Sequence, residues 1–194
     1  TGGDKHHCGI TDQGSLYCWG EPGDWLAPGF VAAYQGTSSG VIARYWGSDF
    51  KQVSSTADHA CGLHRDGTLE CWGHDDYGQT EEPEGRFYEV AAGSNFTCGL
   101  RPSGTVECWG WSYVTDATPD DTFYSVSAGT ATACAIREVD ESLVCWGRPT
   151  NPIMDVPDGA FRDVTVGSQH ACAITLEDEV VCWGSDEDGQ LGGE

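Results

Sequence analysis

Cysteine is the residue type in this chain with the most chemistry to offer, and its spacing restricts what that chemistry is. The 194 residues include ten cysteines, which fall in five pairs ten or eleven positions apart. Thiols in such number would be hazardous in an oxidising compartment unless paired, and in a reducing one they usually bind metals. No Cys-x-x-Cys pattern of a zinc site occurs. The pairs are Cys8 and Cys18, Cys61 and Cys71, Cys98 and Cys108, Cys134 and Cys145, and Cys172 and Cys182.

Clustered carboxylates offer a second kind of chemistry, the binding of a hard cation. Asp75 and Asp76, and again Asp186 and Asp188, lie in sequences typical of turns. Oxygen ligands gathered in this way suit Ca²⁺. Calcium is therefore a candidate cofactor, although the chain requires none. The alternative is a solvated acidic turn in which the first Asp caps the loop.

The sequence patterns that resemble catalytic motifs lack the neighbouring structure that those motifs require. Residues 36–40 read Gly-Thr-Ser-Ser-Gly, but the hydrolase motif of this form needs a strand before it and a helix after it, and the sequence predicts neither. His6, His59 and His170 each stand two positions before the first Cys of a pair. This recurrence favours a supporting place in a strand over metal ligation. We expect a protein that is not an enzyme.

Other residues are candidates for contact with a partner protein or for glycosylation. Large aromatic residues anchor protein interfaces, and Trp25, Trp111 and Tyr113 occur in the variable segments between the cysteine pairs. Asn95 begins an Asn-Phe-Thr acceptor sequence for N-glycosylation, just before Cys98 on a predicted strand.

The cysteine pairs belong to a repeat of constant period. Trp-Gly follows the second Cys of every pair, and four of these Trp residues succeed one another at intervals of 37 residues. A Phe-x-x-Val element precedes four of the pairs. A fixed period of this length indicates stacked repeats. The four Trp residues are Trp72, Trp109, Trp146 and Trp183.

Each pair is predicted to join the two strands of a β-hairpin. A three-residue loop at 65–67, with Gly67 in the left-handed conformation, places Leu63 opposite Leu69 and Cys61 opposite Cys71. The Cys rungs then fall at non-hydrogen-bonded positions, where a disulfide fits best. We therefore expect five local disulfides. In the fifth unit Asp178 replaces the Gly, and in the fourth the extra residue is expected in the turn 138–142.

The same register separates two faces of each hairpin. The face with the disulfide also carries an apolar pair such as Leu63 and Leu69, and we expect it to be buried. On the other face the residue after the first Cys is always Gly or Ala. Such a small residue is expected to let a neighbouring sheet approach to about 10 Å.

The chain is expected to form one tandem-repeat domain over 1–194. Its units span about 1–29, 50–86, 87–122, 123–160 and 161–194. The stretch 30–49 contains Tyr45-Trp46-Gly47 and is either a degenerate unit, with Tyr45 in place of Cys, or an ordinary 16-residue insertion.

Charge and composition exclude several classes of protein. Asp and Glu number 31 against 9 Lys and Arg, a formal charge of −22, so a phosphate backbone is repelled and nucleic acid is not an expected partner. No apolar run reaches the length of a membrane span. The 27 Gly and the absence of helical periodicity favour an all-β chain. Paired cysteines place it outside the cell or at its surface.

The string Cys-Gly-Leu-x-x-x-Gly-Thr-x-x-Cys-Trp-Gly, followed by Asp-x-x-Gly-Gln at 75–79 and 186–190, resembles the repeat of the regulator of chromosome condensation family. More narrowly, it resembles a short, cysteine-paired version from secreted bacterial proteins. The resemblance covers nearly the whole chain. It implies blade-like antiparallel sheets, in a β-propeller or an open array or filament. The nucleotide-exchange activity of the family's nuclear member is not carried over, because disulfides are foreign to that compartment.

Family propellers usually have seven four-stranded blades, more than the five units found here, or six with the degenerate one, so the ends of the array are expected to be open or completed by another chain. The leading functional hypothesis is a non-catalytic extracellular structural or adhesive repeat that self-associates through these ends. The alternative is a secreted propeller that binds or inhibits another extracellular protein.

Overall fold

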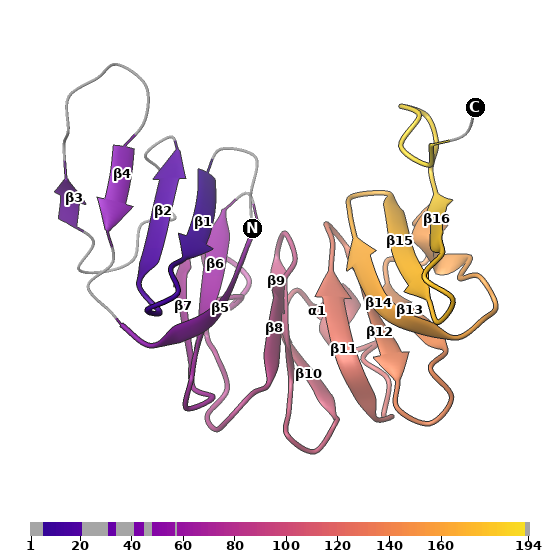
Figure 1. Ribbon diagram of the computed structural model, residues 1–194, viewed down its shortest axis with the longest axis horizontal. Coiled ribbons are helices and arrows are strands. Elements are labelled where there is room, and N and C mark those ends of the chain that lie inside the picture. The colour runs from indigo at the N-terminus through magenta and orange to yellow at the C-terminus, as the bar shows by residue number, and fades with distance from the viewer. Residues whose placement is uncertain (1–5, 21–30, 34–40, 45–47, 57, 193–194) are drawn as a thin grey trace.

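Five small antiparallel sheets follow one another along an open arc in the computed structural model (Figure 1). The structure describes residues 6–20, 31–33, 41–44, 48–56 and 58–192. Sheet 1 has four strands in the order β1-β2-β4-β3, and sheets 2 to 5 have three strands each in chain order. The predicted all-β class and the blade-like sheets are confirmed, although four of the sheets have three strands where the family usually has four.

The strands are short and lie in chain order from sheet to sheet. Sheet 1 contains β1 (His6–Ile10), β2 (Leu16–Gly20), β3 (Val31–Ala33) and β4 (Val41–Arg44). Sheet 2 contains β5 (Phe50–Ser55), β6 (His59–His64) and β7 (Leu69–Gly73), and sheet 3 contains β8 (Glu89–Ala92), β9 (Phe96–Leu100) and β10 (Val106–Gly110). Sheet 4 contains β11 (Phe123–Ala128), β12 (Thr132–Arg137) and β13 (Leu143–Gly147), and sheet 5 contains β14 (Phe161–Val166), β15 (His170–Thr175) and β16 (Val180–Gly184). Two short helices, α1 (Ser112–Thr115) and η1 (Pro152–Met154), lie between sheets.

The cysteine hairpin has the register that the sequence predicts. Cys61 faces Cys71 and Leu63 faces Leu69, and a disulfide joins the two cysteines with their Cα atoms 4.1 Å apart. This is the closer of the two antiparallel spacings, as expected for a non-hydrogen-bonded rung. All ten cysteines form such links within their own sheets, with Cα separations of 4.0–4.1 Å.

The loop of each hairpin turns through one residue with a positive φ. Gly67 has φ 93°, Asp178 has φ 66°, and in the longer fourth loop Glu141 has φ 61°. Where another sheet follows, the backbone carbonyl of this residue also accepts a hydrogen bond from the Phe that leads into that sheet. The backbone N–H of Phe87 donates to the Gly67 carbonyl at 2.8 Å, and that of Phe161 donates to the Glu141 carbonyl at 2.8 Å. The hairpin loop therefore fixes where the following sheet begins.

Consecutive sheets pack by two different faces. Adjacent strand residues point to opposite sides, so each sheet has a disulfide face, with its Cys pair, and a tryptophan face, with the Trp of its Cys-Trp-Gly. The disulfide face of sheet 1, with Cys8, Leu16 and Cys18, packs on Phe50 and Trp72 of the tryptophan face of sheet 2. The same arrangement recurs between sheets 2 and 3, 3 and 4, and 4 and 5.

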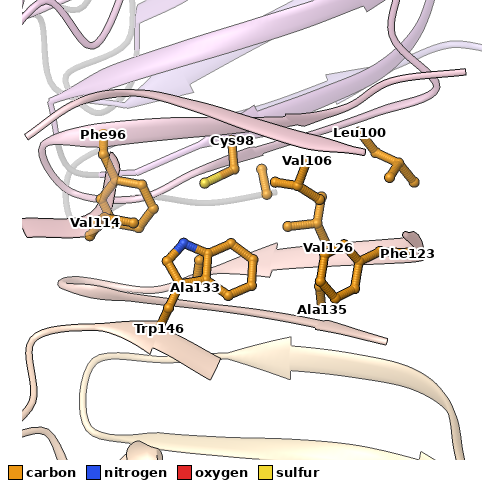
Figure 2. Packing of buried hydrophobic residues seen from close by; sticks show 11 residues of the cluster. Phe96, Cys98, Leu100, Val106, Val114, Phe123, Val126, Ala133, Ala135 and Trp146 are labelled. Carbon is orange, nitrogen blue, oxygen red and sulfur yellow. The ribbon is translucent and has the colours of Figure 1, made fainter. Parts of the chain in front are cut away.

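The interface between sheets 3 and 4 shows this packing in detail (Figure 2). Trp146 points from sheet 4 toward Cys98 of sheet 3, with Phe123 and Val126 beside it under Leu100 and Val106. The four Trp residues at such interfaces are 2–8% exposed. The packing of an indole ring on a disulfide is thus the contact that recurs at each interface of the core.

The small residue after the first Cys has a different role from the one predicted. A Cβ on Gly62 would lie 2.4 Å from a ring carbon of Phe50, and one on Gly99 would lie 2.4 Å from a ring carbon of Phe87. Phe50 belongs to the same sheet as Gly62, and Phe87 lies two residues before β8 of the sheet that contains Gly99. The expectation of a closely approaching neighbouring sheet is therefore wrong in detail: the space is filled by the sheet's own Phe.

Sheet 1 differs from the rest in its strands. The segment between its hairpin and sheet 2 supplies β3 and β4, and β4 pairs with β2. The described residues of sheet 1 include no strand that precedes β1 and carries a Phe, so β1 and β3 are its edges. Neither helix in the described part of the chain is long and apolar enough to cross a membrane.

Candidate binding surface

A bulge in the first strand of a sheet sets one side chain outward. β5, β11 and β14 each begin at a buried Phe, and their pairing with the next strand shifts by one residue directly after it. We call these three strands, with β8, the Phe strands; β8 begins two residues after Phe87. Since a bulge leaves one residue outside the ladder, the residue after each Phe is free to project from the surface.

Three such residues are exposed, and Tyr88, which follows Phe87 directly before β8, is exposed as well; together we call these four residues the bulge row. The row has a cation at each end and two phenols between. The Lys51 ammonium lies 5.8 Å from the centre of the Tyr88 ring, and the Tyr124 hydroxyl donates to the backbone carbonyl of Phe161 in the next sheet. The bulge row consists of Lys51, Tyr88, Tyr124 and Arg162.

A pocket of about 580 Å³ opens between the two phenols. Its lining includes Lys51, Tyr88, Arg101, Tyr124 and Glu138. Arg101 is already engaged, since its guanidinium stacks 3.9 Å from the centre of the Phe87 ring and its Nε donates to Glu107 at 2.9 Å. Two aromatic rings, one ammonium group and the Glu138 carboxylate therefore line the pocket besides Arg101.

Glu89 also lines this pocket. Burial raises the pKa of its carboxyl group above the usual value, and the charge of Asp163 adds to the effect, while a hydrogen bond from the backbone N–H of Val126 opposes it. That hydrogen bond is 3.0 Å long. The carboxylate thus binds sheet 3 to sheet 4.

The Phe strands line a longer, polar groove of about 790 Å³. Side chains link each Phe strand to the next one: Gln52 of β5 both donates to the Val90 carbonyl at 3.1 Å and accepts from the Val90 N–H at 3.0 Å. Ser127 of β11 accepts from the Val166 N–H at 3.1 Å. The groove wall is consequently a hydrogen-bonded surface that extends across four sheets.

The acidic turns are built around a capping carboxylate. Asp75 Oδ1 accepts from the Thr80 N–H at 2.8 Å, and Asp186 Oδ1 accepts from the Leu191 N–H at 2.9 Å. This is the capping role that the sequence offered as the alternative to calcium. The Asp76 carboxylate instead lies 3.1 Å from Nε2 of His74, and Asp188 is exposed. Over the residues that the structure describes, no three His, Cys, Asp or Glu side chains gather as a metal ion would need.

The aromatic residues singled out from the sequence have different surroundings. Trp111 and Tyr113 come together at α1, with ring centres 5.0 Å apart. Trp111 is partly buried against the core between sheets 3 and 4, whereas Tyr113 is 58% exposed. Tyr113 is therefore the more exposed of the two rings. Trp25 lies outside the described residues.

The sequence predicts Asn95 on a strand, but the structure has it in the bend directly before β9. Its side chain is half-buried, and its backbone carbonyl accepts a hydrogen bond from the backbone N–H of Trp111 at 2.9 Å.

One of the repeated histidines has the predicted supporting role. His59 is fully buried, and its Nε2 lies 2.9 Å from the hydroxyl of Thr97 in the next sheet. Thr97 in turn donates to the carbonyl of Gln79, which also accepts from the Trp109 indole at 2.9 Å. These buried bonds join the turn after sheet 2 to the hairpin of sheet 3.

Sequence reasoning missed the bulge row. A bulge depends on how two strands pair, and the Phe-x-x-Val spacing alone does not show it. A signal was nevertheless present, because the position after Phe holds a large cation or phenol in all four Phe strands. A long side chain beside a fully buried Phe suggests that it points outward.

Known structures with the same fold come from several kingdoms. The ectodomain of the Arabidopsis thaliana receptor kinase ACR4 is 27% identical, with a TM-score of 0.70 over 94% of this chain and 61% of that one. The ectodomain of the Physcomitrella patens receptor kinase CR4 is 25% identical, with a TM-score of 0.74 over 95% and 51%. Prp20p of Saccharomyces cerevisiae is 16% identical, with a TM-score of 0.74 over 97% and 58%, a likeness of fold alone. This chain therefore spans less than two thirds of each.

Comparison with curated proteins finds no match. The Regulator of chromosome condensation (RCC1) repeat matches residues 1–24, 50–79, 87–114 and 161–190, which together exceed half of the chain. These matches fall on sheets 1, 2, 3 and 5, whereas sheet 4, whose hairpin also carries Cys-Trp-Gly, lies outside the matched ranges. By repeat sequence and by propeller-type fold, the chain belongs to the regulator of chromosome condensation repeat family.

Proposed function

We propose that this protein is a non-catalytic extracellular module that binds another protein through the bulge row and the adjoining groove. The observation that carries the proposal is the bulge row itself. Two exposed phenols stand in line on successive sheets with a cation at either end. Aromatic rings on a rigid support lose little conformational entropy on binding, and they anchor many protein interfaces.

An extracellular location is supported by the cysteines. Five disulfides leave no free thiol in the chain, and bonds of this kind persist in oxidising surroundings. The two plant neighbours at 25–27% identity are ectodomains of receptor kinases. A surface that carries a charge of −22 also suits a soluble protein that works outside the cell.

The shape of the surface favours binding over catalysis. The pocket and the groove are open, and the groove wall consists of backbone and side-chain groups that already bond to one another. Lys51 and Arg162, two of the nine basic residues, flank the phenols, although Arg162 already forms an ion pair with Asp178 at 2.6 Å. A partner segment that combines aromatic or apolar groups with a carboxylate would match this arrangement.

A displayed library of random peptides tests the proposed binding surface. Binders selected on the oxidised protein should lose at least about tenfold in affinity when Tyr88 and Tyr124 are both changed to Ala, since buried aromatic anchors contribute 2 kcal/mol or more, roughly, at such sites. Tyr77→Ala is the control, because Tyr77 is 51% exposed on a turn away from the groove. The variant Tyr113→Ala tests the contact residue suggested by sequence.

Binders that depend equally on Tyr77, or that lose affinity only with Tyr113→Ala, would contradict the bulge row as the binding surface.

A further inference from the structure

A further pocket, of about 360 Å³, opens at the turn that follows sheet 4. This turn supplies Arg148, Thr150 and Asn151 to the lining, and the bends before β12 and β15 supply Thr130 and Ser168, among others. We call it the Arg148 pocket. Thr130 and Ser168 also line the polar groove of the Phe strands, so the pocket adjoins that groove.

The charge of this pocket differs from that of the rest of the chain. Arg148 is the one charged residue among the described residues that line it. The turn 148–154 contains no Asp or Glu, whereas the turn after sheet 2 contains Asp75 and Asp76 and the turn after sheet 5 contains Asp186. In a chain with 31 Asp and Glu against 9 Lys and Arg, the pocket is therefore a local site of positive charge.

The guanidinium group of Arg148 is available to a ligand. Four other arginines each form an ion pair with a carboxylate of the chain: Arg65, Arg101, Arg137 and Arg162. Arg148 is exposed and forms no ion pair within the part of the chain that the structure describes. Its charge is thus not balanced nearby, and its N–H groups remain donors for an anion.

Hydrogen bonds hold the turn of Arg148 against both neighbouring sheets. The Arg148 backbone N–H donates to the Ala131 carbonyl at 2.9 Å. The Asn151 side-chain amide donates to the Ser168 carbonyl at 3.2 Å, and its Oδ1 accepts from the Ile153 N–H at 3.2 Å. The walls of the pocket are therefore in place before a ligand arrives, which lowers the entropic cost of binding.

These donors fit a carboxylate better than other anions. A guanidinium group presents its N–H groups in a planar fork that matches the two oxygens of a carboxylate, and the Thr130 and Thr150 hydroxyls can donate beside it. A single positive charge balances a single negative one. A phosphate group, with a charge of about −2, would leave an excess that the acidic chain repels.

We propose that the Arg148 pocket binds a carboxylate group, with the guanidinium paired to its two oxygens and the Thr130 and Thr150 hydroxyls donating to them. A sugar acid and the C-terminus of a peptide both carry a carboxylate among polar groups, and the test distinguishes these two sources. The inference is independent of the proposed protein-binding surface, because no residue of the bulge row lines this pocket.

A titration of the oxidised full chain, followed in two-dimensional amide NMR spectra, tests the inference. The probes are glucuronate, a sugar acid, and N-acetylglycine, which ends as a peptide does; glucose and N-acetylglycine amide are their uncharged counterparts. At least one carboxylate should shift the amide signals of Thr130, Arg148 and Ser168 with a Kd of about 1–10 mM, a range expected for one charged group. The uncharged counterparts should not. The tighter probe identifies the source, and equal affinities mean that the carboxylate alone is recognised.

Variants of Arg148 identify the group that binds. Arg148→Ala should weaken carboxylate binding at least about tenfold, because it removes the one charge of the described lining. Arg148→Lys should recover part of the affinity, since an ammonium group keeps the charge but not the planar fork. Arg65→Ala is the matched control: Arg65 is also exposed, but it pairs with Asp49, and its loss should leave binding unchanged.

Signals of Arg148→Ala outside the pocket that match those of the unmodified chain show that the variant is folded. Three results would overturn the proposal: no shift at the three residues up to about 50 mM of either carboxylate, unchanged affinity in Arg148→Ala, or tighter binding of inorganic phosphate than of both carboxylates.

Discussion

At the scale of single residues, the fit between a glycine and a phenylalanine ring decides how each hairpin holds its Phe strand. Gly62→Ala places a methyl group against the fully buried Phe50 ring. We expect a loss of about 1–3 kcal/mol in the free energy of unfolding, the usual cost of overpacking a core. Denaturant unfolding of the two proteins measures it.

Gly9→Ala is the matched control for that substitution. Gly9 holds the same hairpin position in sheet 1, where the nearest atoms to an added Cβ are Trp19 ring carbons at 3.6 Å. The free energy of unfolding should stay within about 0.5 kcal/mol or rise, because Ala has less conformational entropy to lose than Gly. Equal destabilisation by both substitutions would show that the Phe50 ring is not the cause.

Glu89 gives the stability a dependence on pH. Burial raises the pKa of this carboxyl group in the folded protein, so its ionised form is disfavoured there. The resulting penalty is absent below the unfolded pKa of about 4.3 and develops as the pH rises through the higher folded pKa. Glu89→Gln removes the charge and keeps an acceptor for the Val126 N–H. Its unfolding midpoint should exceed that of the parent at pH 7, and the difference should shrink toward pH 4.

Thermal unfolding across this pH range measures the effect. A variant that is less stable than the parent at pH 7, or a difference that stays constant with pH, would show that the hydrogen bond to Val126 outweighs the burial of charge.

At the scale of elements, the hairpin could be predicted from the sequence because all its determinants are local. The interval between two cysteines and one residue with a positive φ, such as Gly67, fix the loop and hence the register. The fourth loop follows the same logic with Glu141 in the left-handed conformation. The bulges after Phe50 and Phe123 were not predictable in this way. They depend on where the Phe N–H meets the loop of the preceding sheet, a contact between units.

The contribution of a disulfide should depend on its place in the stack. Replacing Cys172 and Cys182 by Ala removes a short closed loop from the half-buried end, and it should cost about 3 kcal/mol. Replacing Cys61 and Cys71 removes a loop of the same length. It should cost at least about 1 kcal/mol more, because Trp109 then faces a cavity.

Guanidinium unfolding of the two double variants measures this difference. Equal losses would mean that packing of the indole on the disulfide adds nothing to the closure of the loop.

At the scale of the whole molecule, the sheets pack through the same pair of faces, a disulfide face on a tryptophan face, at four successive interfaces. The sequence predicts the apolar face of every hairpin but not which faces remain uncovered, since burial depends on the number and order of the sheets. Ile136 and Leu143 are buried by sheet 5, whereas the equivalent Ile174 and Val180 have no sheet over them among the described residues. The bulge row also arises at this scale, because its residues come from four successive sheets.

Five local disulfides are the claim on which the extracellular location and the packing of the sheets both depend. Proteolysis without reduction, followed by mass spectrometry of protein purified from its native source, tests it most directly. The fold predicts five linked peptide pairs, each from one sheet, and no thiol that reacts with an alkylating agent. Links between different sheets, or alkylated cysteines in the native protein, would contradict it.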